Sequence, residues 1–471
     1  MKPTELNQLM EYIHKDPMNQ IRLNLEQPQL ITEAIHMPRL MIQLRDDPIL
    51  FTRLLLGINP TSYQVKLLKS THPRIHVCWP RQSGKTRTLA ALSIWHAAYH
   101  PDHTILIVAP SERQSINLRD QIHTLLGYMP KEIKKTLIKR STRTRIYYRN
   151  GSTVIALPNS PDTIRGYRAH LVILDEAAFF QHDEQVLRHT MIPMLATTRG
   201  RLILSSTPWG KNSIFYQLSK DPEYQHHHIT WKTPLEEGVY TPEFKTEIQR
   251  TMETNPLAYQ TEYMADFIEE ADTWLTTTLL TQAINPALEY LPYDKPTQGM
   301  YYMGIDLAER VDHSAIAVIH RTHDKLQLVH LHKFPIGEPL TTVIGYTKIL
   351  ATNWRTIHHT YIDNTRHGDH IINDFQAATT PATGITFTHR NKMHMAMLLK
   401  TRLTDHTLQI PYHRDTLIEL NTPTYHPTRH GTIQYDHPQG THDDAFWATA
   451  LAITATEENT PHSHPMARTT K

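Results

Sequence analysis

The chain has 471 residues, enough for two large domains or about three average ones. Its 48 Lys and Arg residues nearly balance 46 Asp and Glu residues. The resulting net charge of +2 excludes a histone-like or polyanionic protein, so any nucleic-acid surface must be a local patch. The single cysteine, Cys78, excludes disulfide and Cys-ligated metal frameworks, and without a long apolar segment we expect a soluble intracellular protein with no membrane partner.

Residues 1–50 are predicted to form a helical N-terminal segment, because apolar residues recur there at three- and four-residue spacings. From about residue 74 the pattern changes to short apolar runs separated by helical stretches. The expected buried strands are Ile75–Trp79, Thr104–Ala109, Val154–Leu157, Leu171–Leu174 and Leu202–Ser205. Strands that alternate with helices predict an α/β domain over residues 51–262, with a mostly parallel sheet and helices on both faces.

Residues 261–294 carry seven acidic side chains and no Lys or Arg, so we expect an acidic linker over residues 263–295. A second α/β domain is predicted over residues 296–456, followed by a flexible tail over 457–471. Its expected strands are Met300–Leu307, Ala315–His320, Gln327–His332, Thr360–Asn364 and Gly384–Thr388, with helices at Thr341–Thr352, near 392–405 and near 441–455. Three strands at hairpin spacing, a helix and then strand–helix repeats is the element order of a ribonuclease H-like fold.

The sequence Trp79-Pro-Arg-Gln-Ser-Gly-Lys-Thr86 lies between a predicted strand and a helix-like stretch, which is the setting of a phosphate-binding P-loop. The loop amides at Gly84 and the helix N-terminus would face the phosphates of a nucleotide. Lys85 would reach the β- and γ-phosphates, and the Thr86 hydroxyl would bind Mg²⁺. The sequence departs from the usual pattern at Trp79, which stands in the first glycine position.

Two carboxylates further along the chain support the P-loop. In Leu171-Val-Ile-Leu-Asp175-Glu176, four apolar residues run into two acids. A parallel strand ending in this way places both acids at its C-terminal edge, where open α/β sheets bind ligands. Asp175 would hold Mg²⁺ and Glu176 would activate the attacking water. The alternative is a strand that runs into a capping Asp-Glu pair; with the P-loop, the pattern predicts an NTPase.

Further residues suggest roles around the same nucleotide. The Arg81 guanidinium could stabilise charge on the transferring phosphoryl group. Ser206 and Thr207 end an apolar run and could couple loss of the γ-phosphate to movement, although a simple strand-ending turn explains them equally well. Tyr63 and Gln64 suit adenine recognition, with an ordinary surface pair as the alternative.

Residues 131–149 form a basic stretch, with eight Lys and Arg residues against one Glu and a net charge of +7. Such a stretch is either a solvated basic face or a contact surface for a phosphate backbone. The sequence leaves both interpretations open.

Four aspartates stand out in the second half of the chain. Asp306 and Asp363 lie in apolar strands, where burying an acid is costly unless it binds something. Asp443 and Asp444 open a predicted helix, where capping alone would favour acids. Acids that converge from distant segments typically hold two divalent metals, here Mg²⁺ or Mn²⁺, which clamp a phosphodiester. His442 could support a ligand or be one more histidine in a His-rich chain.

Taken in order, these motifs resemble the large terminase subunit of tailed double-stranded DNA viruses, over residues from about 50 to 455. The matching segments are Tyr63-Gln64, Trp79–Thr86, Arg165-Gly166, Leu171–Glu176, Ser205–Pro208 and Tyr263–Phe267. The nuclease acids of the family map to Asp306, Asp363 and Asp443, with Asp444 as an additional or substitute ligand.

The resemblance implies an ATP-driven motor that moves double-stranded DNA into a procapsid, and a two-metal endonuclease that cuts concatemeric DNA. It implies the portal protein and the small terminase subunit as partners, in the cytoplasm of an infected host cell. It further implies a homo-oligomer on the portal and a monomer free in solution. The alternatives are a cellular helicase-like translocase with a fused ribonuclease H-like nuclease, and a non-enzymatic DNA- or partner-binding scaffold.

Overall fold

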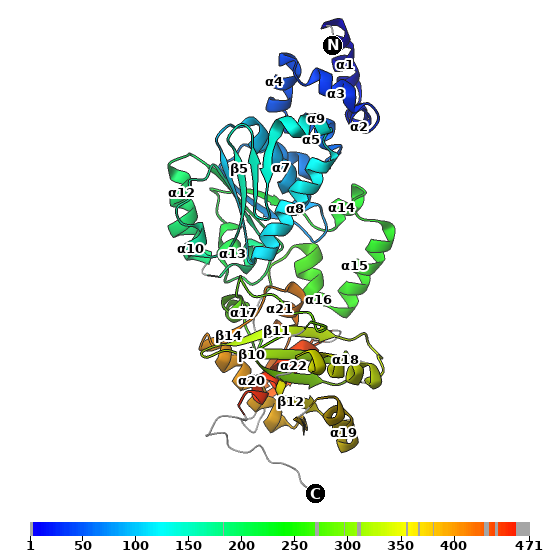
Figure 1. Cartoon of the computed structure of the whole chain (residues 1–471), viewed down its shortest axis with the longest axis vertical. Coiled ribbons are helices and arrows are strands. Elements are labelled where there is room, and N and C mark those ends of the chain that lie inside the picture. Colours follow the sequence, from blue (N-terminus) through cyan, green and yellow to red (C-terminus); the bar gives the residue numbers. More distant parts are fainter. Residues whose placement is uncertain are drawn as a thin grey trace. The chain divides into compact units, whose positions relative to one another are not determined.

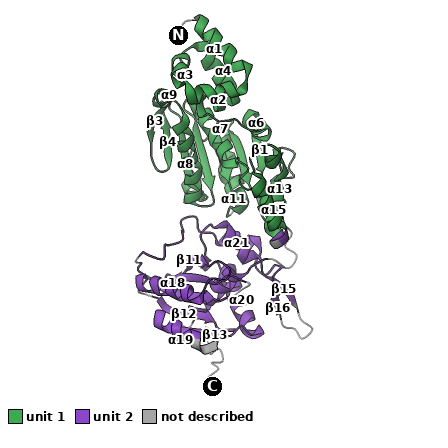
Figure 2. Cartoon of the chain, turned by 90° about the vertical axis from the view of Figure 1, so that its right-hand side faces the viewer, with its two compact units in different colours: residues 1–252, 257–268 green, residues 253–256, 269–471 purple. Residues whose placement is uncertain are grey.

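The computed structural model describes residues 3–181, 183–268, 273–295, 297–308, 312–354, 357–365, 368–379, 381–427, 433–438 and 441–457. The chain divides into two compact units, coloured separately in Figure 2. Unit 1 comprises residues 1–252 and 257–268, and unit 2 comprises residues 253–256 and 269–471. None of the helices in the described ranges is both long and apolar enough to cross a membrane.

Unit 1 begins with short helices that each start at a proline, whose fixed φ suits the first helical turn. Their bounds are α1 (Pro3–Lys15), α2 (Pro17–Glu26), α3 (Pro28–Ala34), α4 (Pro38–Asp46) and α5 (Pro48–Leu56). The side chains of Asp16 and Asp47 accept hydrogen bonds from the second residues of α2 and α5, at 2.8 and 2.9 Å. Such caps satisfy backbone donors that the helix leaves unpaired.

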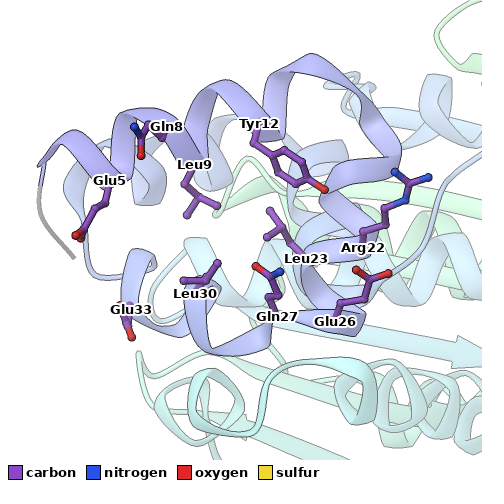
Figure 3. A pocket seen from close by; sticks show the side chains of 10 residues that line it. All are labelled: Glu5, Gln8, Leu9, Tyr12, Arg22, Leu23, Glu26, Gln27, Leu30 and Glu33. Atoms are coloured by element: carbon purple, nitrogen blue, oxygen red, sulfur yellow. The ribbon is translucent and has the colours of Figure 1, made fainter.

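Helices α1, α2 and α3 line a pocket of about 580 Å³, shown in Figure 3. Leu9, Leu23 and Leu30 form its apolar part, and glutamates stand at its rim. None of the site residues predicted from the sequence lines this pocket. This pocket therefore does not locate the predicted sites, which are identified below from the register of the strands and the chemistry of their side chains.

The sheet of unit 1 has the strand order β3-β4-β5-β2-β6-β7-β1-β8. The strands are β1 (Arg74–Cys78), β2 (Thr104–Ala109), β3 (Ile138–Ser141), β4 (Arg145–Tyr148), β5 (Thr153–Pro158), β6 (Leu171–Asp175), β7 (Arg201–Ser206) and β8 (Gln225–His228). From β5 to β8 every neighbouring pair is parallel, whereas β3 and β4 add an antiparallel edge. The predicted mostly parallel sheet is confirmed; β3, β4 and β8 were not predicted.

Helices cover both faces of this sheet (Figure 1). Ile75 and Val77 of β1 share a core with α7 (Lys85–Tyr99) and α8 (Glu112–Tyr128). His76 points to the other face, where its ring stacks on Phe215 of α13 (Ile214–Leu218) at 4.1 Å. The other helical segments are α6 (Ser62–Lys69), α9 (Lys131–Leu137), α10 (Pro161–Ile164), η1 (Ala177–Phe179), α11 (Asp183–Val186), η2 (Leu187–Met191), α12 (Ile192–Ala196), α14 (Lys232–Glu236), α15 (Pro242–Thr254), α16 (Pro256–Ala258) and η3 (Tyr259–Met264).

The main sheet of unit 2 has the order β13-β12-β9-β10-β11-β14. Its strands are β9 (Met300–Asp306), β10 (Ala315–Arg321), β11 (Leu326–Lys333), β12 (Ile357–Asp363), β13 (Ala382–Ile385) and β14 (Leu408–Gln409), and β15 (Thr424–Pro427) pairs separately with β16 (Ile433–Asp436). Strands β9, β10 and β11 are antiparallel, whereas β12 is parallel to β9 and β13 to β12. This arrangement confirms the predicted ribonuclease H-like fold.

The helices of unit 2 are α17 (Thr277–Ala283), α18 (Leu340–Asn353), α19 (Gly368–Ala378), α20 (His389–Thr404), α21 (Arg414–Asn421) and α22 (Asp444–Ala455). Strand β13 ends at Ile385 rather than at the predicted Thr388, because the Thr388 hydroxyl caps α20 by accepting from the Asn391 amide at 3.2 Å. The predicted linker 263–295 is divided between the units. In unit 2 its Trp274 is buried and donates to the Ala396 carbonyl at 3.0 Å.

Helix α22 lies directly on the backbone of β9. A Cβ atom added at Gly304 would stand 2.1 Å from the Ala448 carbonyl oxygen and 2.3 Å from the Ala452 nitrogen. Because both atoms belong to the helix backbone, no side-chain rotation could relieve the contact. Gly304 therefore fixes how closely α22 approaches the sheet.

We expect Gly304→Ala to destabilise unit 2 by about 1–3 kcal/mol or more, because α22 would have to move away from β9. The matched control is Gly345→Ala in α18, where a Cβ would meet nothing within 4 Å. That substitution should stabilise by about 0.5–1 kcal/mol. Urea unfolding measures both, and equal stability of Gly304→Ala and the wild type would contradict the close contact.

Two candidate active sites

The first candidate site lies at the C-terminal edge of strands β6, β7 and β1. These strands are neighbours, with Cys78 paired with Ser206 and Ser205 paired with Asp175. The loop after Cys78, the end of β7 and the acids at the end of β6 therefore lie together. This is the edge at which parallel α/β sheets bind ligands.

The predicted adenine pair contacts the P-loop directly. The Tyr63 hydroxyl donates to the Ser83 carbonyl at 2.7 Å, and Gln64 Nε2 lies 3.4 Å from the same oxygen. Gly84 has φ +84°, and a Cβ there would stand 2.5 Å from Gln64 Nε2. Glycine is thus required at this position by both the backbone conformation and the approach of Gln64. Thr86 lies half-buried in the first turn of α7.

Trp79, the departure from the usual P-loop pattern, is a packing residue. Its side chain is fully buried, and its ring meets the Tyr63 ring edge-to-face, with centroids 4.9 Å apart and planes at 88°. Such pairs add to the energy of apolar burial. Because Tyr63 also holds the Ser83 carbonyl, Trp79 supports the loop from inside the core.

The acids after β6 face the P-loop lysine. Lys85 Nζ lies 3.6 Å from Glu176 Oε1, and the Ser206 hydroxyl donates to Glu176 Oε2 at 3.1 Å. Glu176 has φ +53°, an uncommon conformation for a non-glycine residue that often marks functional sites. Thr207 follows Ser206 and is buried. Glu176 therefore links the P-loop to the end of β7.

Burial and the neighbouring Glu176 carboxylate raise the pKa of Asp175 to about 6, although Lys85 opposes the shift. The Asp175 Oδ1 atom is buried and has no hydrogen-bond partner among the described residues. A buried carboxylate oxygen in this condition fits a cation ligand. Asp175 and the Thr86 hydroxyl are the groups that would hold Mg²⁺ here.

Two residues near Arg81 were missed by the sequence analysis. The Arg81 amide donates to the Glu262 carbonyl at 2.8 Å, and its guanidinium lies 3.9 Å from the Glu262 carboxylate. The Tyr240 hydroxyl donates to the Arg81 carbonyl. Glu262 belongs to the acidic stretch of the sequence, yet it is buried, and burial of an acid leaves no local sequence signal.

The basic residues 131–149 occupy α9, β3 and β4 at one edge of the sheet. Some of them are engaged within the chain: Lys135 lies 2.9 Å from Glu132, and the Arg140 guanidinium lies over the Tyr147 ring at 4.6 Å. Arg165 and Gly166 are exposed after α10. A role of the basic residues 131–149 in binding nucleic acid stays a prediction.

The second candidate site lies at the ends of β9 and β12. Ile305 pairs with Ile362 in parallel register, so the next residues, Asp306 and Asp363, end neighbouring strands side by side. Both are buried, and Asp363 Oδ1 accepts from the Thr365 amide at 2.9 Å. Burial, followed by the charges of Asp363, Asp444 and Asp443, raises the pKa of Asp306 well above its usual value. The aspartates from three elements thus share one electrostatic environment.

The two acids at the start of α22 differ. Asp443 Oδ2 accepts a hydrogen bond from Trp447 Nε1 at 2.7 Å. Asp444 is buried, and its Oδ2 has no hydrogen-bond partner in the described part of the chain. Burial chiefly raises the pKa of Asp444 to about 7, with Lys333 opposing. His442 Nδ1 lies 3.5 Å from Asp312 and 4.0 Å from Asp444.

Crowded, buried carboxylates of this kind suit hard divalent cations, which accept oxygen ligands and relieve the repulsion. Within the described residues, no three His, Cys, Asp or Glu side chains are already arranged as a complete metal cage. The fit to a cation therefore rests on the raised pKa values and on the unsatisfied Asp444 oxygen. The residues that would hold the metal are Asp306, Asp363 and the Asp443–Asp444 pair.

Several known proteins are similar to this chain. Residues 78–282 match the family described as "Terminase large subunit, T4likevirus-type, N-terminal". The large terminase subunit of Thermus virus P23-45 is 22% identical over 458 residues, covering 86% of this chain and 89% of that protein. Among solved structures, the large terminase ATPase domain of Thermus phage P74-26 is 22% identical, with a TM-score of 0.39 over 46% of this chain and 97% of that one. The magnesium-bound large terminase nuclease of phage G20c is 18% identical, with a TM-score of 0.35 over 40% and 98%.

The fold and the two sites define a chain that combines a P-loop NTPase unit with a ribonuclease H-like unit. The family match and the relative confirm the resemblance predicted from the sequence. The chain is thus similar to the large terminase subunits of tailed phages.

We expect Trp79→Gly, which restores the usual P-loop residue, to destabilise unit 1 by about 3–5 kcal/mol, because it leaves a cavity beside Tyr63. Trp79→Phe keeps an aromatic ring against Tyr63, so its free energy of unfolding should fall by markedly less than that of Trp79→Gly. Urea unfolding followed by circular dichroism measures both. A Trp79→Gly variant as stable as the wild type would show that the indole does not support the loop.

Proposed function

We propose that this chain is a genome-packaging large terminase, an ATP-driven motor for double-stranded DNA with a metal-dependent endonuclease. The motor occupies residues 51–262 and the nuclease residues 296–456. The observation that carries the proposal is the presence in one chain of a P-loop facing Asp175–Glu176 and a separate group of buried aspartates. Phosphoryl transfer and phosphodiester cleavage each need one of these constellations.

In the motor, Lys85 and the amides at the start of α7 bind the β- and γ-phosphates of ATP. Glu176 is the base that activates the attacking water, and Arg81 stabilises charge on the transferring phosphoryl group. Mg²⁺ held by Asp175 and Thr86 would neutralise phosphate charge. Tyr63 and Gln64 contact the P-loop and recognise the adenine of ATP.

Coupling to movement rests on the end of β7. The Ser206 hydroxyl touches the Glu176 carboxylate that faces Lys85, so a change at the γ-phosphate reaches Ser206 and Thr207 through Glu176. Both residues lead out of a central strand, which transmits the change to the rest of the unit. This contact supports the role of Ser206 and Thr207 as coupling residues.

In the nuclease, the residues that would hold two divalent cations, Mg²⁺ or Mn²⁺, are Asp306, Asp363 and the Asp443–Asp444 pair. The cations would supply Lewis-acid and water-activating chemistry. The unsatisfied Oδ2 of Asp444 supports direct ligation by this residue. The hydrogen bond from Trp447 orients Asp443. His442 lies beside Asp444 as a supporting group.

The partners follow from the packaging role: double-stranded DNA, the portal protein of a procapsid and the small terminase subunit. The chain works as a homo-oligomer on the portal and is a monomer when free in solution. Packaging takes place in the cytoplasm of the infected host cell.

We expect Lys85→Ala to abolish ATP hydrolysis, because it removes the cation beside the phosphates and Glu176, while plasmid cleavage stays largely intact. The control is Lys69→Ala on the exposed side of α6, which should leave both activities unchanged. Phosphate release and agarose gels measure the two activities. ATPase activity that survives in Lys85→Ala would remove Lys85 from its assigned role.

We expect Asp306→Asn to reduce Mg²⁺- or Mn²⁺-dependent cleavage of supercoiled plasmid by about 100-fold or more. Without metal, the variant should melt no lower than the wild type at pH 8, because a buried, repelled carboxylate becomes neutral. Added Mg²⁺ should raise the melting temperature of the wild type more than that of the variant.

The matched control is Asp324→Asn, an exposed residue in the turn between β10 and β11. It should cleave and melt like the wild type. Full cleavage by Asp306→Asn would rule out this aspartate as a metal ligand.

A further inference from the structure

A lysine that the sequence analysis did not single out lies beside the aspartates of unit 2. Lys392 is in the first turn of α20 and is half-buried. Its ammonium lies over the Trp447 ring at 4.6 Å and over the Phe387 ring at 5.3 Å. The two rings are themselves in contact, with centroids 5.3 Å apart. Aromatic faces attract cations, so this pair of rings holds the ammonium in place.

The same tryptophan contacts a carboxylate of the site. Trp447 Nε1 donates to Asp443 Oδ2 at 2.7 Å, so the indole meets Asp443 with its edge and Lys392 with its face. Burial and the other aspartates raise the pKa of Asp306, and Lys392 is a cation whose charge opposes that rise. Lys392 therefore lies within electrostatic reach of Asp306.

Lys392 nevertheless forms no ion pair with a carboxylate in the described part of the chain. Among the residues that the structure describes, no Asp or Glu oxygen lies within 4 Å of its ammonium. Ring faces attract the charge but do not replace the acceptor oxygens that an ammonium prefers. A lysine held in this way, next to acids that suit metal ions, can still bind an anionic oxygen brought by a ligand.

We propose that Lys392 binds a phosphate of the DNA strand at the cleavage site, and that Trp447 is the positioning residue for both Lys392 and Asp443. The inference rests on the proposed nuclease function and assigns it a DNA-binding residue. Lys392 contacts a phosphate oxygen next to the aspartates that would hold the metal ions, and its positive charge offsets the negative charge of that phosphate. Phe387 and Trp447 keep the ammonium from collapsing onto the acids when no DNA is bound.

The test uses the full chain and the variants Lys392→Gln and Lys392→Arg. The matched control is Lys400→Gln, because Lys400 is on the same helix and lies over another indole, that of Trp274, at 4.2 Å. Binding to a short duplex is measured from low to high salt with Ca²⁺ in place of Mg²⁺, and gels check that the duplex stays intact. Cleavage is measured separately with Mg²⁺.

We expect Lys392→Gln to reduce the salt slope of log K by about 0.9, the value for one lost phosphate contact. It should lower kcat/KM for cleavage by about 10- to 100-fold, as for loss of one hydrogen bond to a charged group. Lys392→Arg should restore most of the salt slope and most of kcat/KM for cleavage. Lys400→Gln should change neither the salt slope nor kcat/KM. An unchanged salt slope in Lys392→Gln would overturn the proposal, even if the variant were less stable.

Trp447→Phe separates the two contacts of the indole. It keeps a ring face for Lys392 but removes the N–H that orients Asp443, so the salt slope should stay and kcat should fall. A salt slope that falls as it does in Lys392→Gln would contradict the assigned division of roles. If the wild type cleaves nothing, the proposed nuclease function fails, and the binding experiment still decides whether Lys392 contacts phosphate.

Discussion

Both units bury carboxylates at the C-terminal ends of parallel strands, and this constraint organises each site. In unit 1 the register places Asp175 beside the end of β7. In unit 2 it places Asp306 beside Asp363. Buried anions at such an edge are costly unless cations or donors compensate them. Each site accordingly has a lysine near its acids, Lys85 in one and Lys392 in the other. Each also has a carboxylate oxygen with no hydrogen-bond partner among the described residues.

Close backbone approach is the second requirement that the sites share. Gly84 admits the Gln64 amide to the P-loop, and Gly304 admits the backbone of α22 to β9. Without the second contact, the acids at the start of α22 would not reach the ends of the strands. Aromatic rings then fix the remaining side chains, Trp79 against Tyr63 in one unit and Trp447 against Asp443 in the other. In both units, close packing thus fixes the positions of the charged side chains in the candidate sites.

Much of the fold could be predicted because its buried strands are short apolar runs with clear ends. This rule holds for β1, β2, β5, β6 and β7 in unit 1 and for β9, β10 and β11 in unit 2, and Asp175 and Asp306 end two of these strands. Strands β3, β4 and β8 were missed. The side chains of β3 and β8 are mostly exposed and polar, and β4 alternates between partly and fully buried residues, so none of the three forms an apolar run. Glu262 was counted only as one acid of the stretch 261–294, since its burial beside Arg81 depends on the path of the whole unit.

The sequence alone determined the two kinds of chemistry predicted for this protein, nucleotide hydrolysis and phosphodiester cleavage. A P-loop and acids at strand ends need particular residue types at particular spacings. The tertiary structure decided which side chains complete them. Trp79 contacts Tyr63 and Lys392 contacts Trp447, each distant in the chain, and neither composition nor periodicity encodes such a contact. A side chain's neighbours across a core are set by how helices pack on sheets, and that packing is a property of the folded chain as a whole.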